Sequence, residues 1–138
     1  NLALSNKSKN QKFYEKEITS QSSFYREKSL VFKKLRNIST YNINCISIDQ
    51  FNKKNKNIYH IVKIDCEGED LNIIKGAKNL LKNNLIKLLK IELKFTENNF
   101  YEIINYLNKY KYKLVTITKV KFNKYETIDH LDAYFEKK

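Results

Sequence analysis

The chain has 138 residues and carries 27 Lys and Arg against 15 Asp and Glu, a formal net charge of +12. This length suits one domain with a hydrophobic core, and no apolar run approaches the roughly 18 residues that a membrane-spanning helix needs. The positive charge is nearly all Lys and is scattered along the chain, while Pro and Trp are absent. This pattern indicates A/T-rich codon bias, so we expect no specific nucleic-acid partner.

The two cysteines, Cys45 and Cys66, each lie in or beside a predicted strand. Their spacing fits neither a metal site nor a disulfide framework. We interpret them as buried, reduced thiols of a cytoplasmic protein.

The first half of the chain predicts short strands separated by polar segments. Strands are expected at "NLALS" (residues 1–5), "QKFYEKEI" (11–18) and "INCISI" (43–48), because apolar, aromatic and β-branched residues recur there. The segment 19–40 is polar and receives no assignment. A helical turn follows the third strand, with Asp49 as its predicted N-cap.

The second half predicts alternating strands and helices. A central strand is expected at residues 58–65. Two amphipathic helices are expected at residues 68–83 and 98–110, and Asn99 is the predicted N-cap of the second. Three further strands are expected at residues 86–95, 112–118 and 131–137. We expect the last two strands to pair as an antiparallel edge across a polar connection, residues 119–130. Alternation of this kind predicts an α/β fold with a parallel central sheet.

Acidic residues gather where two predicted strands end. Lys63 and Asp65 share one face of their strand, and Lys90 and Glu92 repeat the pattern in the next one. Glu67 follows at the entry to the helix. Ligands of open parallel sheets bind beyond the carboxyl ends of the strands. Three neighbouring carboxylates could raise one another's pKa, hold a divalent cation or supply a general base.

Helix-start electrostatics offers another explanation for part of this cluster. Glu67, Glu69 and Asp70 fall in the first turn of the predicted helix, where the helix dipole favours negative charge by about 0.3–1 kcal/mol each. We prefer this explanation for Glu69 and Asp70 and leave both open for Glu67. Glu92 could act in the site or form an ion pair with the lysine two residues before it. Asp65 still belongs to the strand, which favours a functional role.

The glycines and histidines receive structural interpretations. Gly76 lies inside the predicted helix, where glycine costs about 1 kcal/mol relative to alanine, so we expect close packing of this helix on the sheet. Gly68 permits a tight turn or a close backbone approach to a ligand. His60 and His130 show no partner pattern, and we expect His60 to be a packed residue.

The segment "VKIDCEGEDLNIIKGAKNLL", residues 62–81, resembles the signature of FkbM-type methyltransferases. In that family a strand K-I-D-x-E-G leads into a helix E-L-x-x-L-x-G-A. The matching residues are Lys63, Ile64, Asp65, Glu67, Gly68, Glu69, Leu71, Ile74, Gly76 and Ala77. The strand ending in Glu92, the opening "NLALS" and "NCISIDQF" with Asp49 resemble other segments of the family.

The resemblance implies a Rossmann-like class I methyltransferase sheet and methyl transfer from S-adenosylmethionine. The implied acceptor is a hydroxyl of a sugar or another small metabolite. Asp65, Glu67 and Glu92 are the implied catalytic residues, and Ser5, Asn6 and Asp65 the implied cofactor contacts, with no metal assigned. The alternative function is a small basic module that binds nucleic acid or a polyanionic glycan.

The glycine-rich turn that holds the cofactor in such enzymes has no counterpart in this sequence, because its glycines, Gly68 and Gly76, lie outside any G-x-G context. We therefore expect residues 1–138 to form a single incomplete domain, the carboxyl-terminal part of a methyltransferase without its amino-terminal cofactor-binding strands. We expect it to be inactive alone, and to self-associate through an exposed sheet edge.

Overall fold

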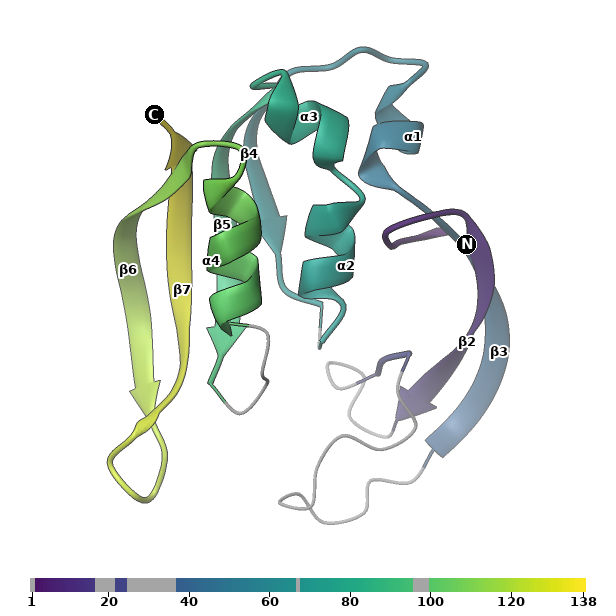
Figure 1. Cartoon of the computed structure of the whole chain (residues 1–138). Helices are drawn as coiled ribbons and strands as arrows, with labels where there is room; N and C mark the ends of the chain where they lie inside the picture. The colour runs from purple at the N-terminus through teal and green to yellow at the C-terminus, as the bar shows by residue number, and fades with distance from the viewer. Residues whose placement is uncertain (1, 17–21, 25–36, 67, 96–99) are drawn as a thin grey trace.

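The computed structural model describes residues 2–16, 22–24, 37–66, 68–95 and 100–138 (Figure 1). The elements follow one another along the chain as β1 (Leu2–Leu4), β2 (Lys9–Lys16), β3 (Asn37–Ile46), α1 (Ile48–Asn52), β4 (Tyr59–Ile64), α2 (Asp70–Lys75), α3 (Lys78–Lys82), β5 (Ile86–Lys94), α4 (Phe100–Asn108), β6 (Tyr112–Phe122) and β7 (Ile128–Lys137). No helix within these ranges is long and apolar enough to cross a membrane.

The strands form two sheets. A small sheet has the order β1-β3-β2, and a larger sheet has the order β4-β5-β7-β6. In the larger sheet β4 and β5 are parallel, whereas β7 is antiparallel to both of its neighbours. The predicted mixed α/β class and the antiparallel pairing of the last two strands are confirmed. Residues 58–65, predicted as a central strand of a larger domain, form β4 at one edge of the described sheet, where the exposed edge of this chain is expected.

The apolar face of the larger sheet packs against helices. Figure 1 shows α2, α3 and α4 on one side of this sheet. The alternation along β5 and β7 directs one set of side chains into the core with residues from these helices. The buried cluster includes Leu89, Ile91, Leu93, Leu131, Ala133, Phe135, Ile74, Leu81, Ile103 and Leu107. The other face of the sheet carries charged residues of both strands, among them Lys90, Glu92 and Asp132.

The predicted helix over residues 68–83 is two helices, α2 and α3, that break at Gly76. A Cβ added at Gly76 would lie 2.2 Å from the carbonyl oxygen of Ser5, so the end of β1 approaches the chain closely at this point. This confirms the close packing expected at Gly76. The break leaves the N–H groups of α3 to be capped from outside, because each helix start has N–H groups without intrahelical partners.

Asp49 provides that cap. Its carboxylate accepts hydrogen bonds from the backbone N–H groups of Asn79 (2.8 Å) and Leu80 (3.0 Å) at the start of α3. The prediction that Asp49 caps its own helical turn is wrong, since Ser47 is the N-cap of α1 and accepts a hydrogen bond from the N–H of Gln50. Asp49 instead joins the end of the small sheet to the helices of the larger one.

Three strands extend well beyond their predicted limits. β3 begins at Asn37 and pairs with β2 along its length, which takes in polar residues left unassigned by the sequence pattern. β6 runs to Phe122 and β7 starts at Ile128, so most of the predicted polar connection is strand. Pairing with a neighbouring strand overrides the polar composition here. Asn99, the predicted cap of α4, lies outside the described residues.

Both cysteines are free thiols. Cys45 is buried in β3, as predicted. The prediction of burial is wrong for Cys66, which is exposed and lies two residues beyond the end of β4.

Candidate functional site

The parallel register of β4 and β5 brings two of the predicted carboxylates together. Lys63 lies opposite Lys90 and Ile64 opposite Ile91. One further step along both strands brings Asp65 beside Glu92 at the carboxyl edge of the sheet. The two side chains are close enough to exchange a hydrogen bond, which confirms that they lie near each other as predicted.

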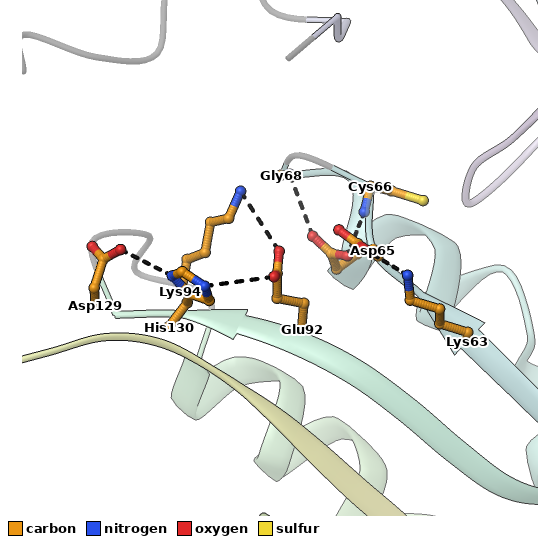
Figure 2. A network of polar contacts seen from close by, with 9 residues as sticks. Lys63, Asp65, Cys66, Gly68, Glu92, Lys94, Asp129 and His130 are labelled. Atoms are coloured by element: carbon orange, nitrogen blue, oxygen red, sulfur yellow. Dashed lines mark hydrogen bonds and ion pairs between the residues drawn. The ribbon is translucent and has the colours of Figure 1, made fainter. Parts of the chain in front are cut away.

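The two carboxylates differ in their electrostatic surroundings. The ammonium of Lys63 lies 2.8 Å from Asp65 Oδ2, and this hydrogen bond lowers the pKa of Asp65. Partial burial, followed by the neighbouring Asp65 charge, raises the pKa of Glu92. Figure 2 shows Glu92 between Asp65 and the side chains of Lys94 and His130, which lie 3.8 and 3.9 Å from its oxygens. Such a divergent pair suits proton transfer.

A charged pocket of about 150 Å³ covers this face of the sheet. Its walls come from all four strands and consist of Lys63, Asp65, Lys90, Glu92, Lys119, Lys121, His130 and Asp132. The buried carboxylate of Asp132 lies 2.7 Å from the Lys90 ammonium and 3.7 Å from that of Lys119. The alternative of a Glu92 ion pair with Lys90 is therefore wrong, since Lys90 pairs with Asp132.

The sequence-based interpretation missed the contribution of β6 and β7 to this pocket. A signal was present in "HLDAYF", where His130 and Asp132 alternate with the buried Leu131, Ala133 and Phe135. This alternation indicates a strand with one apolar and one polar face. It does not reveal that the polar face would lie beside Glu92, because that depends on the pairing of β7 with β5.

A second, mostly apolar cavity of about 380 Å³ lies between the small sheet and β4. Its apolar walls include Ala3, Leu4, Phe13, Phe24, Ile48, Val62, Ile64 and Ile73. Lys63 and Asp65 line this cavity and the charged pocket as well. Asp65 thus lies between the apolar cavity and the charged pocket.

The turn between β4 and α2 is held by Asp70. Its carboxylate accepts hydrogen bonds from the N–H groups of Cys66 (3.0 Å) and Gly68 (3.3 Å), and Gly68 has a φ of 95°, which favours glycine. Burial raises the pKa of Asp70, against the opposing effect of these N–H groups. Asp70 lies in the first turn of α2, as predicted. Glu67 lies outside the described residues.

Glu69, Ser5 and Asn6 join the end of β1 to α2. Glu69 is buried and accepts hydrogen bonds at 3.2 Å from the hydroxyl of Ser5 and from the Asn72 amide, so it does more than supply charge at a helix start. Ser5 is fully buried, and the Asn6 amide lies 3.4 Å from the side chain of Asn72. Neither Ser5 nor Asn6 lines the apolar cavity, so their contact with a cofactor stays a prediction.

Metal ligands are not grouped in the part of the chain that the structure describes. No three or more His, Cys, Asp and Glu side chains there converge in a way that could hold an ion. The lysines of the charged face are interleaved with carboxylates, with Lys63 beside Asp65 and Lys94 beside Glu92.

Comparison with known protein families matches residues 1–114 to the methyltransferase FkbM domain. The match spans both β-sheets as far as the third residue of β6 and includes Asp65 and Glu92. The chain therefore belongs to the FkbM methyltransferase domain family, and this membership supports a methyltransferase function. Searches of curated proteins and of solved structures gave no match.

Proposed function

We propose that this protein transfers a methyl group from S-adenosylmethionine to a hydroxyl of a sugar or another small metabolite. The observation that carries the proposal is the position of Asp65, which lines both the apolar cavity and the charged pocket. A donor in the first and an acceptor in the second would meet at this carboxylate. Holding two reactants in line is the main task of the protein when the methyl group is already activated.

The walls of the apolar cavity suit part of the cofactor. Its volume of about 380 Å³ lies in the range of small-molecule sites, and Phe13, Ile48 and Val62 offer apolar surface to an aromatic base. Asp65 at the rim offers negative charge near a sulfonium. S-adenosylmethionine, when bound, supplies an electrophilic methyl group on that sulfonium.

The Asp65–Glu92 pair would accept the proton of the acceptor hydroxyl. As the acceptor oxygen takes the methyl group that S-adenosylmethionine would supply, leaving S-adenosylhomocysteine, the hydroxyl proton would pass to the Asp65–Glu92 pair. Glu92 has the higher pKa of the two, so it would hold the proton while Asp65 stays ionised. Glu67 is kept as a third catalytic candidate because of the family motif alone.

We also propose that these residues form the carboxyl-terminal part of a cofactor-binding domain in a cytoplasmic enzyme. Both glycines lack the G-x-G context of a cofactor-binding turn, and the outer edge of β4 is unpaired among the described residues. Ile58 and Ile61 are exposed near this edge, which favours self-association of the isolated chain. Calorimetry should detect no tight binding of S-adenosylmethionine to residues 1–138 alone.

The Asp65→Asn variant tests the catalytic proposal in the protein as the cell makes it. Loss of the Asp65 carboxylate would break the Asp65–Glu92 pair that accepts the proton, so the turnover rate should fall by about 10²–10⁴-fold. The Lys63–Asp65 pair is exposed, so the melting temperature should change little. Formation of S-adenosylhomocysteine with a panel of sugars and hydroxylated metabolites provides the assay.

Glu136→Gln is the matched control, because Glu136 is an exposed carboxylate of β7 that lines neither cavity. It should leave turnover unchanged. Full activity of Asp65→Asn would show that Asp65 is structural. Failure of the unmodified protein, as the cell makes it, to bind S-adenosylmethionine would refute the whole proposal.

A further inference from the structure

β6 contains a bulge at the wall of the charged pocket. Thr118 lies opposite Asp132, but the next paired residue, Lys121, lies opposite His130, so β6 has one residue more than β7 across this step. Lys119, inside the bulge, has a φ of 51°, a conformation that glycine adopts readily and lysine rarely. Bulges of this kind redirect side chains, and they occur often beside active sites.

This end of the pocket carries more positive than negative charge. Asp132 is shared by two ammonium groups, those of Lys90 at 2.7 Å and Lys119 at 3.7 Å. Lys121 also lines the pocket and has no carboxylate within ion-pair distance among the described residues. We call Lys90, Lys119 and Lys121 the basic end of the pocket, and Asp65 with Glu92 its acidic end.

We propose that the basic end binds an anionic group, a phosphate or a carboxylate, on the acceptor that the enzyme methylates. This inference rests on the proposed function and defines its substrate class. Lys119 and Lys121 are the residues that would contact the anion, and Asp132 would hold Lys90 and Lys119 in position.

The two ends of the pocket together would orient such an acceptor. The ammonium groups of the basic end attract a phosphate or carboxylate, whereas Asp65 and Glu92 are already paired with Lys63 and Lys94 and add carboxylate oxygens that disfavour a nearby anion, so the basic end is the favoured place for it. In that orientation the anion lies against β6 and a hydroxyl of the same molecule faces the acidic end. A pocket of about 150 Å³ holds one substituted part of a sugar or metabolite, not the whole molecule.

The origin of the basic end in the sequence supports a role in acceptor choice. Lys119, Lys121, His130 and Asp132 all follow residue 114, the last residue that matches the methyltransferase FkbM domain. Asp65 and Glu92 lie inside the match. The proton-accepting end therefore comes from the shared domain, and most of the basic end comes from the residues after it.

Calorimetric titration with glucose 6-phosphate, glucuronate and glucose tests the inference on the protein as the cell makes it. The two anionic sugars should bind at least about tenfold more tightly than glucose, as expected for charge-assisted hydrogen bonds. The phosphate and carboxylate arms show which anion the site prefers. Equal binding of glucose would overturn the inference.

Two variants and a control show where the anion binds. Lys119→Gly and Lys121→Gln should each weaken binding of the anionic sugars by about three- to tenfold, since both lysines are partly solvated. Lys113→Gln removes one charge from the same strand, but Lys113 bonds to Asn108 away from the pocket, so binding should be unchanged. Equal weakening by all three changes would indicate nonspecific attraction and overturn the inference.

Lys119→Gly separates function from folding, because its two expected effects have opposite signs. Glycine relieves the left-handed conformation, so the melting temperature should rise by about 2–5 °C while anion binding weakens. If this variant binds the anionic sugars like the unmodified protein, the inference fails.

Methyl transfer distinguishes this inference from the proposed function. Transfer to a neutral acceptor that is unaffected by Lys119→Gly would leave the proposed function intact and overturn the anionic substrate class. Lysine-dependent binding of anionic sugars without any methyl transfer would uphold the anion site and overturn the proposed function.

Discussion

Gly76→Ala should destabilise the protein, although alanine is normally the better residue in and around helices. Gly76 has φ −74° and ψ −7°, a conformation open to any residue. On backbone grounds alone, alanine would stabilise the chain by about 0.4–1 kcal/mol. The added Cβ, however, would meet the carbonyl oxygen of Ser5 at 2.2 Å and the Cα of Asn6 at 3.2 Å.

The size of the loss follows from these contacts. Carbon and oxygen atoms in contact need more than about 3 Å, so the backbone at Ser5 must move by about 1 Å. Overpacking of this kind costs about 1–3 kcal/mol, and the obstacle here is backbone, which cannot rotate away. The Ser5–Glu69 hydrogen bond would also weaken, at about 1 kcal/mol. We expect a net loss of about 2–3 kcal/mol, or 7–10 °C in melting temperature for a chain of this length.

Thermal unfolding followed by circular dichroism measures this effect. Lys75→Ala is the matched control, because Lys75 is the exposed neighbour in the same helix and its change should stay within about 0.5 kcal/mol. A Gly76→Ala protein that melts at or above the temperature of the unmodified protein would refute the close approach of β1 to the break between α2 and α3.

Three further predictions concern the cap, the carboxylate pair and the sheet edge. Asp49→Ala removes two hydrogen bonds to the start of α3 and should lower the free energy of unfolding, measured in urea, by about 1–2 kcal/mol. Asp49→Asn should lose less, because its amide oxygen can still accept one of these bonds. An unchanged urea midpoint for Asp49→Ala would contradict the cap. Protonated Glu92 cannot accept a proton, so the turnover rate should rise as the pH passes the pKa of Glu92, which is raised above the ordinary value of 4.5. Glu92→Gln should abolish this rise in the pH–rate profile. A rise that persists in the variant would belong to another group. Ile61→Lys on β4 should reduce self-association in sedimentation measurements, whereas Ile117→Lys on β6 should not; the reverse result would shift the contact to β6.

The core of the candidate site could be predicted because its two strands follow a local rule. Lys63 and Asp65 repeat the spacing of Lys90 and Glu92, and one predicted helical segment separates the two strands, so parallel pairing of neighbours is expected, as observed for β4 and β5. Side-chain alternation then predicts which residues share a face.

The helix boundaries could not be predicted, because contacts distant in sequence decide them. Residues 68–83 have an unbroken helical pattern, yet the helix ends at Gly76, where Ser5 approaches. A second helix begins where Asp49 caps it. Helical periodicity describes one face of a segment and contains no information about which backbone will lie against it.

The order of the last strands sets the remainder of the site. His130 and Asp132 line the pocket because β7 lies between β5 and β6. Lys119 lines it from a bulge in β6 that contains no glycine, so the sequence gives no signal for it. Sequence patterns predict that β6 and β7 are strands, but the choice between their possible neighbours depends on the whole sheet.

The division of the pocket between two parts of the chain has a consequence for acceptor choice. Asp65 lines the apolar cavity as well as the pocket, and with Glu92 it lies within the residues that match the family domain. Lys119 and Lys121 line the pocket alone and lie in the strand segment after the match. A change at Asp65 would therefore affect donor alignment and proton transfer together, whereas changes in the outer part of β6 would alter the acceptor while leaving the donor cavity as it is. Under the proposed function, substrate range would then be set by β6 and β7, beside the Asp65–Glu92 pair at the carboxyl edge of β4 and β5.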